Sequence, residues 1–115
     1  MATISAADQA RLQERGKLGF GEALGAVMND GARARRAGWI DRARWIAYER
    51  GIPAVHSSSF QHPGNIAHAE SRGGVVAVMA CLTMKKPCGA IMLGWTPTQT
   101  DLAASDWYLL EKGEA

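Results

Sequence analysis

Cysteine is scarce in this chain, and no stretch of it is apolar for long enough to cross a bilayer. Neither Cys81 nor Cys88 lies at a metal-ligand spacing from a second Cys or His pair. The longest apolar run, from Val75 to Met84, is shorter than the roughly 20 residues that a membrane helix needs. The N-terminus has no basic-then-apolar leader pattern. We therefore expect a protein that stays in a cytoplasm, with no disulfide, bound metal or membrane span.

Strongly one-sided charge is missing too. The net charge of +2 is too small to indicate a nucleic-acid-binding protein, and 21% charged with 47% hydrophobic residues is typical of a single globular domain. The arginines nevertheless concentrate between positions 33 and 50: Arg33, Arg35, Arg36, Arg42, Arg44 and Arg50. Such a cluster can bind phosphate groups, or it can form the solvated face of a strand. The sequence supports both interpretations.

A convincing set of catalytic residues is also absent. The three histidines recur every six residues, a spacing that places no two of them on one helical face: His56, His62 and His68. Cys81 lies among apolar residues, where a thiol is typically buried and inert. Asp101 and Asp106 flank the end of a short helix, which favours capping or a ligand hydrogen bond over acid–base catalysis. The pattern indicates a binding protein rather than an enzyme, with no catalytic residue and no cofactor.

The hydrophobic periodicity predicts an α+β fold. Apolar residues from Phe20 to Met28 repeat at the spacing of an amphipathic helix, and Gly31 suits the left-handed position that follows it. Alternating patterns predict antiparallel strands, of which the first two form a hairpin: 32–39, 43–49, 75–84, 90–95 and 107–111. We expect this small sheet, the N-terminal helix and a short C-terminal helix to form one domain in a homo-oligomer.

The predicted domain organisation has two further parts. Ser5 begins a capping pattern for a polar helix over 6–15, so residues 1–17 are interpreted as a helical extension of a ligand-binding domain over 18–115. Residues 51–74 are rich in Gly, Pro and Ser and predict a long loop, with room for a turn or two of helix at 66–71.

The segment from Trp95 to Trp107 carries the strongest signal for a ligand site. Thr96 is predicted to cap a short helix, with Pro97 at its first position and Gln99 at its third. The hydroxyls and free N–H groups of that helix end would lie beside a large indole, which suits a ligand with a flat base and negative charge. Trp39 and Trp95 follow glycines at strand ends, where one ring face can stay free for stacking.

Two motifs resemble those of a known family. Residues 20–24 (FGEAL) and 31–39 (GARARRAGW) resemble its opening motif, FGEAL…G…V.R.GW, and residues 95–107 (WTPTQTDLAASDW) resemble its closing motif, W.PS.TDLLA.DW. The family is that of the Thoeris anti-defence proteins of the second type, small phage proteins formerly described as a domain of unknown function. The resemblance covers residues 18–50 and 75–111, and the motifs are specific when they occur together in this order.

The resemblance implies a phage-encoded sponge that acts in the cytoplasm of the bacterial host. Members bind a glycocyclic ADP-ribose signal made by TIR-domain enzymes and hold it intact, in pockets between the protomers of a homo-oligomer, a tetramer in known cases. Some relatives also bind CBASS cyclic di- or trinucleotides. Carried over to this chain, the pocket residues are Gly38, Trp39, Trp95, Thr98 and Asp101, with Arg36 as the arginine beside them, whereas Asp106 and Trp107 match positions that we expect to be structural.

Three departures separate this chain from the family pattern: the N-terminal extension, the His- and Ser-rich middle segment, and Thr98-Gln99 in place of a Ser-Gln pair. Two other functions stay open. An enzyme could hydrolyse the same signal, or an interaction module could inhibit a host protein through Trp39 and Trp95. We favour the sponge. Nanomolar capture of a signal requires a binding free energy of about −12 kcal/mol. A crevice shared between two small protomers can provide this more readily than one protomer alone.

Overall fold

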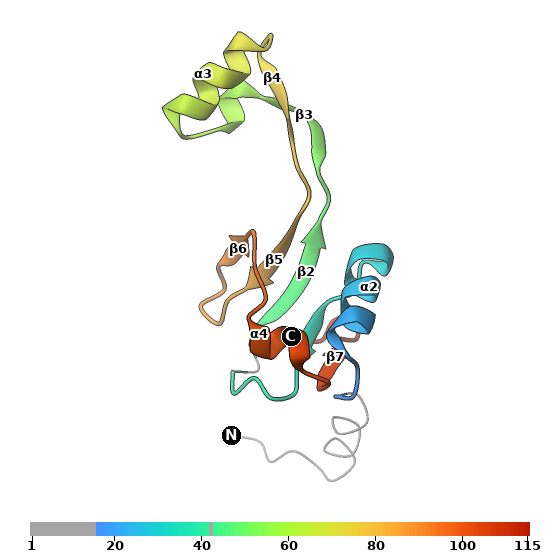
Figure 1. Cartoon of the computed structure of the whole chain (residues 1–115). Coiled ribbons are helices and arrows are strands. Elements are labelled where there is room, and N and C mark those ends of the chain that lie inside the picture. Colours follow the sequence, from blue (N-terminus) through green and yellow to red (C-terminus); the bar gives the residue numbers. More distant parts are fainter. Residues whose placement is uncertain (1–15, 42) are drawn as a thin grey trace. The chain divides into compact units, whose positions relative to one another are not determined.

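The computed structural model describes residues 16–41 and 43–115, and it has the predicted α+β composition (Figure 1). The helix predicted over 6–15, and with it most of the expected extension, lies outside these residues. The chain divides into two compact units: residues up to Tyr48 together with Leu82–Ala115, and the intervening Glu49–Cys81. Among the described residues, none of the helices combines the length and the apolar character that crossing a bilayer demands.

The first unit is built on a five-stranded antiparallel sheet with the strand order β6-β5-β2-β1-β7. Its strands are β1 (Ala34–Arg36), β2 (Trp45–Glu49), β5 (Cys81–Lys85), β6 (Ile91–Leu93) and β7 (Trp107–Leu109). Ala34 pairs with Ile46, which confirms the predicted hairpin, and Arg36 pairs with Trp107 across β1 and β7. The central strands are thus supplied by the arginine-rich segment.

One predicted strand is in fact two. The run over 75–84 was expected to form a single strand, but it divides into β4 (Val75–Val78) and β5, with Met79 and Ala80 between them. The two strands belong to different sheets, and β5 pairs with β6 in an antiparallel hairpin. A continuous apolar and β-branched pattern predicts the extended conformation but not the point at which the pairing partner changes.

The predicted amphipathic helix is confirmed as α2 (Phe20–Asp30), which buries Phe20, Ala23 and Val27. Gly31 follows it at φ 70°, a left-handed conformation that glycine adopts without strain. The buried face of α2 packs on residues of the sheet, among them Ala34, Ile46, Met84 and Trp107. The core of this unit therefore lies between the helix and one face of the sheet.

The C-terminal helix is present but begins two residues later than predicted. α4 (Gln99–Ala103) is capped by Thr98, whose hydroxyl accepts a hydrogen bond from the Asp101 N–H at 3.1 Å, while the Asp101 carboxylate accepts one from the Thr98 N–H at 3.0 Å. The prediction of Thr96 as the cap was wrong because the reciprocal Thr-x-x-Asp pair, with a charged acceptor, satisfies the helix end better than Gln99 would.

The second unit, Glu49–Cys81, replaces the predicted long loop. It contains a hairpin of β3 (Ile52–His56) and β4, a 3₁₀ turn η1 (Ser57–Ser59) and the helix α3 (Pro63–Ser71). His56 and His62 act as caps, because each Nδ1 accepts a backbone N–H bond, from Ser58 at 3.2 Å and from Gly64 at 3.0 Å. Histidine is not among the usual cap residues, so the start of this helix was not predicted, although Pro63 at its first position is a typical start signal.

Candidate functional site

Arg36 joins the segments that carry the two sequence motifs. From β1, its Nε donates to Asp106 Oδ1 at 2.9 Å and its Nη1 donates to Asp101 Oδ1 at 3.0 Å. Asp106 also accepts the Gly38 N–H at 2.7 Å. The Trp39 indole N–H donates to Asp101 at 3.3 Å. Arg36, Asp101 and Asp106, with their donors Gly38, Trp39 and Thr98, form what we call the Arg36 network.

Both carboxylates of this network are held in the ionised form. Burial alone would raise the pKa of Asp101, but hydrogen bonds from the Thr98 backbone and the Arg36 guanidinium outweigh it and place the pKa below its ordinary value of 3.8. The pKa of Asp106 is likewise lowered, because the bonds from Arg36 and the Gly38 backbone outweigh its burial. The pKa of Arg36 is raised. The hydrogen bond to Asp106 is the largest cause, and together with the bond to Asp101 it outweighs burial, which would lower the pKa. Neither carboxyl group is therefore tuned to exchange protons at neutral pH.

Gly38 has a steric role in the network. A Cβ atom at this position would lie 2.5 Å from Asp106 Oδ2, which is the oxygen that accepts the Gly38 N–H. A larger residue must displace a carboxylate that Arg36 also holds.

We expect Gly38→Ala to lower the free energy of unfolding by about 1–2 kcal/mol, because it breaks a hydrogen bond to a charged group. The matched control is Gly25→Ala in α2, where an added Cβ meets nothing within 4 Å. That change should be neutral or stabilise by up to about 1 kcal/mol, since alanine is the better helix former. Urea unfolding of the two variants measures the difference, and equal effects would contradict the steric role of Gly38.

The tryptophans expected to expose a ring face are buried in the described chain. Trp39 is 9% exposed and Trp95 8%, and each ring meets the Trp107 indole edge-on, with centroid distances of 5.2 and 6.4 Å. The Arg44 guanidinium lies 5.4 Å from the centre of the Trp39 ring. Placement after a glycine at a strand end does not free a ring when other aromatic side chains pack against it.

The structure brings five of the six predicted site residues into one bonded cluster. Arg36, Gly38, Trp39, Thr98 and Asp101 belong to the Arg36 network, and Trp95 lies next to it through Trp107. Thr98 and Gly38 are exposed, whereas the carboxylate of Asp101 and both rings lie beneath. The cluster thus has a polar rim over an aromatic floor.

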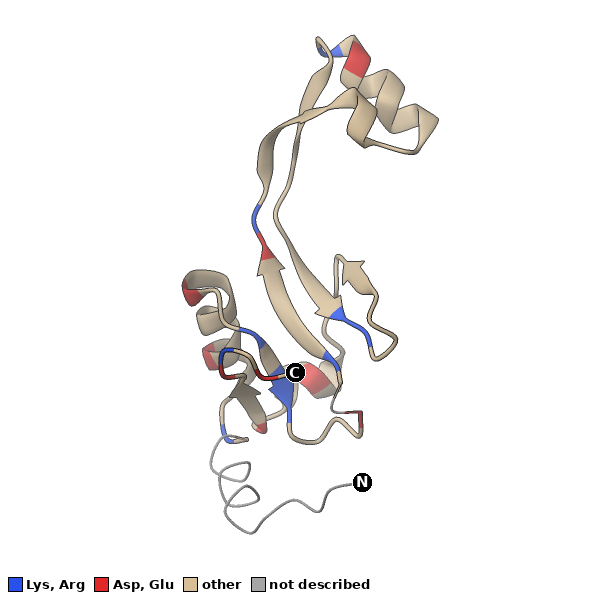
Figure 2. Ribbon diagram, turned by 180° about the vertical axis from the view of Figure 1, so that it is seen from behind, with Lys and Arg blue, Asp and Glu red and all other residues tan. Residues whose placement is uncertain are grey.

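The arginines divide between the two faces of the sheet. Successive residues of a strand point to opposite faces, so Arg36 lies on the face of the core and Arg33 and Arg35 on the other. Arg33 covers the Trp45 ring at 5.2 Å, and the buried Arg35 donates to the backbone oxygen of Ala115. Figure 2 shows the basic residues of this part of the chain. Arg44 was the residue that sequence reasoning did not single out, although its contact with Trp39 places it beside the network.

The polar groups of the cluster are engaged with one another. The described part of the chain has no group of three His, Cys, Asp or Glu side chains able to hold a metal ion. Two of the histidines cap helical segments of the second unit instead. Arg36 keeps both carboxylates ionised, so the network offers fixed charges and hydrogen-bonding groups rather than a general acid.

The comparisons with known proteins agree with the motifs at both ends of this cluster. A family model, described as Tad2-like, the Thoeris anti-defense 2-like domain, matches residues 18–110. No curated protein matches the chain.

Proposed function

This chain belongs to the Thoeris anti-defense 2-like family, and from that premise we propose that it is a phage protein that sequesters a cyclic nucleotide immune signal inside the host cell. The signal is a glycocyclic ADP-ribose of Thoeris, and CBASS cyclic di- or trinucleotides are further candidate ligands. The protein holds the signal without cleaving it. The single observation that carries this proposal is the Arg36 network, which connects both family motifs in one cluster without an ionisable group suited to catalysis.

The proposed binding site is the rim of the Arg36 network. Thr98 and Gly38 are exposed there and contact the ligand directly, while the edges of Trp39 and Trp95 form the floor beneath it. Asp101 accepts hydrogen bonds from three groups, so its role is to hold this floor in place. Rigid support of this kind lowers the entropy that a ligand loses on binding.

Electrostatics favours Arg44 as the phosphate-binding arginine. Arg36 faces two carboxylates, so the charges of these three side chains sum to −1 and do not attract an anion. Arg44 stacks on the Trp39 ring, and its buried Nε has no hydrogen-bond partner among the described residues. A diphosphate beside Trp39 would supply that partner and neutralise the charge.

A homo-oligomer, expected to be a tetramer, completes the proposed site. The edge strand β6 exposes all three of its apolar residues, with Ile91 at 54% and Leu93 at 68%. An unpaired apolar edge is a surface on which another chain can pair. A second copy would also enclose a ligand that the rim of one protomer leaves open to water.

The proposal is tested by incubating the protein with glycocyclic ADP-ribose, removing unbound ligand and then heating the complex. Sequestration predicts the return of intact signal, whereas a cleaved product would identify the hydrolase alternative. Ligand at a hundred times its dissociation constant should also raise the free energy of unfolding by about 2.7 kcal/mol. No thermal shift with any cyclic nucleotide would favour the third reading, a module that binds a host protein.

Two arginine variants locate the site. Arg44→Met and Arg33→Met each remove a guanidinium that covers a tryptophan ring, on opposite faces of the sheet. We expect Arg44→Met to weaken binding of the signal at least tenfold and Arg33→Met to leave it within twofold, as measured by calorimetry. The reverse order would move the site to the other face.

A further inference from the structure

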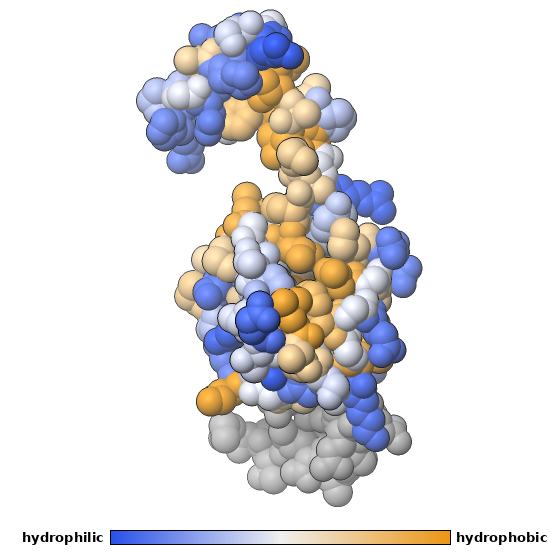
Figure 3. All heavy atoms as spheres, viewed as in Figure 1, coloured by the Kyte–Doolittle hydropathy of each residue, from blue (hydrophilic) through white to orange (hydrophobic). Residues whose placement is uncertain are grey.

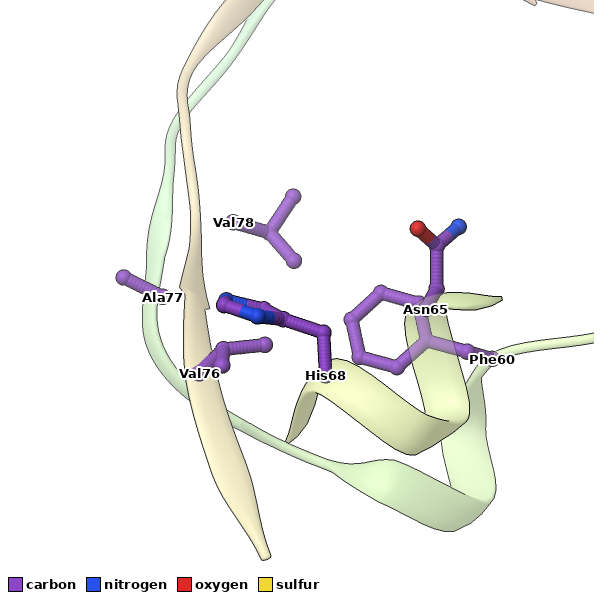
Figure 4. Close-up of a pocket in the computed structure, with 6 residues that line it drawn as sticks. All are labelled: Phe60, Asn65, His68, Val76, Ala77 and Val78. Atoms are coloured by element: carbon purple, nitrogen blue, oxygen red, sulfur yellow. The ribbon is translucent and has the colours of Figure 1, made fainter. Parts of the chain in front are cut away.

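The second unit contains a pocket of its own. It has a volume of about 310 Å³ and is lined by Phe60, Asn65, His68 and the β4 segment from Val76 to Val78. Figure 4 shows the His68 imidazole pointing from α3 toward β4, with the Phe60 ring beside it and the Asn65 amide at the rim. All of these residues lie within Glu49–Cys81, so the pocket is complete in one unit. Its volume is at the lower end of the range, about 300–1,000 Å³, of small-molecule sites.

The walls of this pocket are held by bonds that do not involve the lining side chains. Ser57 N–H donates to the Gly74 oxygen at 2.9 Å, and Gly74 N–H donates to the Ala69 oxygen at 2.9 Å. These two bonds fasten η1 and the end of α3 to the start of β4. The caps at His56 and His62 fix the starts of η1 and α3. The pocket is therefore preformed, which favours ligand binding.

None of the residues that line the pocket is Asp, Glu, Lys or Arg. Between Gly51 and Ala69, and again between Gly73 and Cys81, the sequence contains no Asp, Glu, Lys or Arg. Figure 3 shows hydrophilic residues over the outer surface of α3 and apolar residues toward the hairpin. A phosphate or carboxylate would lose its hydration here without gaining an opposite charge. The chemistry selects an uncharged ligand.

Three side chains give the pocket its specificity. Phe60 and His68 present two aromatic rings side by side, and a flat heterocycle gains about 1–3 kcal/mol from stacking on such a ring. The Asn65 amide has one acceptor and two donors, and it makes no hydrogen bond within the described chain. An amide of this kind can pair with the edge of a base, as it does with adenine.

We propose that this pocket is a second ligand site, separate from the Arg36 network, that binds an uncharged planar heteroaromatic ring of the nucleobase class. The ring lies against Phe60 and His68, the valine methyl groups of β4 contact its edge, and Asn65 bonds its polar atoms. The inference does not depend on the sequestration proposed above, because none of its residues belongs to the Arg36 network.

The three histidines provide an internal control for the test. In the full-length protein, adenosine is titrated while the imidazole resonances are followed by NMR. We expect a saturable shift of the His68 ring signals, with His56 and His62 nearly unchanged, because their rings are engaged as caps outside the pocket. Ribose 5-phosphate, which lacks a base, should produce no shift. Equal shifts of all three histidines would overturn the proposal. So would the absence of any shift at 10 mM adenosine, a concentration of about the weakest dissociation constant of interest.

A pair of exposed variants tests the role of the amide. Asn65→Ala removes the base-pairing group and should weaken adenosine binding at least fivefold, whereas Gln61→Ala removes a nearby amide that does not line the pocket and should have no effect. Both residues are exposed, so both variants should fold. If indole binds as well as adenosine and Asn65→Ala changes neither, the pocket is a socket for an apolar side chain of another protein, and the nucleobase assignment is wrong.

Discussion

Asp101→Ala should lower the free energy of unfolding by about 3–5 kcal/mol, the usual cost of removing one partner of a buried ion pair. The side chain of Asp101 is 9% exposed and accepts bonds from Arg36, Trp39 and Thr98. Alanine leaves these three donors without their acceptor and removes the reciprocal cap of α4. The loss is measured from the urea midpoint and slope.

Asp106→Ala is the matched control for this variant. Asp106 contacts the same guanidinium, but its side chain is 29% exposed, so water can replace the missing carboxylate. We expect less than half the loss seen for Asp101→Ala. If the two variants were equally destabilised, the lost free energy of unfolding would come from the ion pairs of Arg36 rather than from the buried cap of α4.

Acid should reveal the same contribution in the unmodified chain. The pKa of Asp101 is lower in the folded than in the unfolded state, so the unfolded chain binds more protons as the pH falls. The stabilisation is complete above about pH 4 and is lost as the pH decreases through the folded-state pKa. Asp101→Ala should show a shallower loss in this range, with the remaining dependence due largely to Asp106.

Trp107→Ala should cost about 3–5 kcal/mol, the range for removing a large aromatic side chain from a core. The indole is fully buried and lies 5.2–6.4 Å from the ring centres of Phe20, Trp39 and Trp95. Its N–H also donates to the Asp101 backbone oxygen at 3.0 Å. The substitution therefore leaves a cavity at the ring that Phe20, Trp39 and Trp95 all contact.

The control for this prediction is Trp45→Ala, a tryptophan on the opposite sheet face that is only half-buried beneath Arg33. Its loss should be at most half that of Trp107→Ala. Thermal unfolding of the two variants, under identical conditions, gives the comparison. A larger effect at Trp45 would show that the second face of the sheet contributes more to stability than the face under α2.

Helices and strands were predicted correctly from the sequence where a hydrophobic pattern was compatible with a single type of secondary structure. The 3.6-residue repeat from Phe20 ends at a glycine, and the structure has the helix and its left-handed cap. The strands next to Gly38 and Gly89 were also predicted. Residues 51–74 were predicted only in part. The turn or two of helix expected at 66–71 lies within α3, but β3 and the start of α3 were missed, because the helix begins at a histidine cap and because serines and prolines indicate turns as readily as helix starts.

The residues of the Arg36 network were singled out by motif, but their arrangement was not predicted. The sequence placed Asp101 near a helix end and favoured capping or a ligand hydrogen bond as its role. It could not show that Arg36, 65 positions away, would share the carboxylate. Contacts between distant segments depend on strand register, here the pairing of Arg36 with Trp107. The burial of Trp39 follows from the same register and was out of reach for the same reason.

The second unit begins where β2 ends and finishes where β5 starts, and these two strands are neighbours in the sheet. The whole of Glu49–Cys81 thus forms the connection between two neighbouring strands. Its length and chemistry can diverge while the sheet keeps its pairing and the two motifs keep their contacts. Under selection for recognition of new molecules, the second unit could be replaced while the rest of the protein stays unchanged.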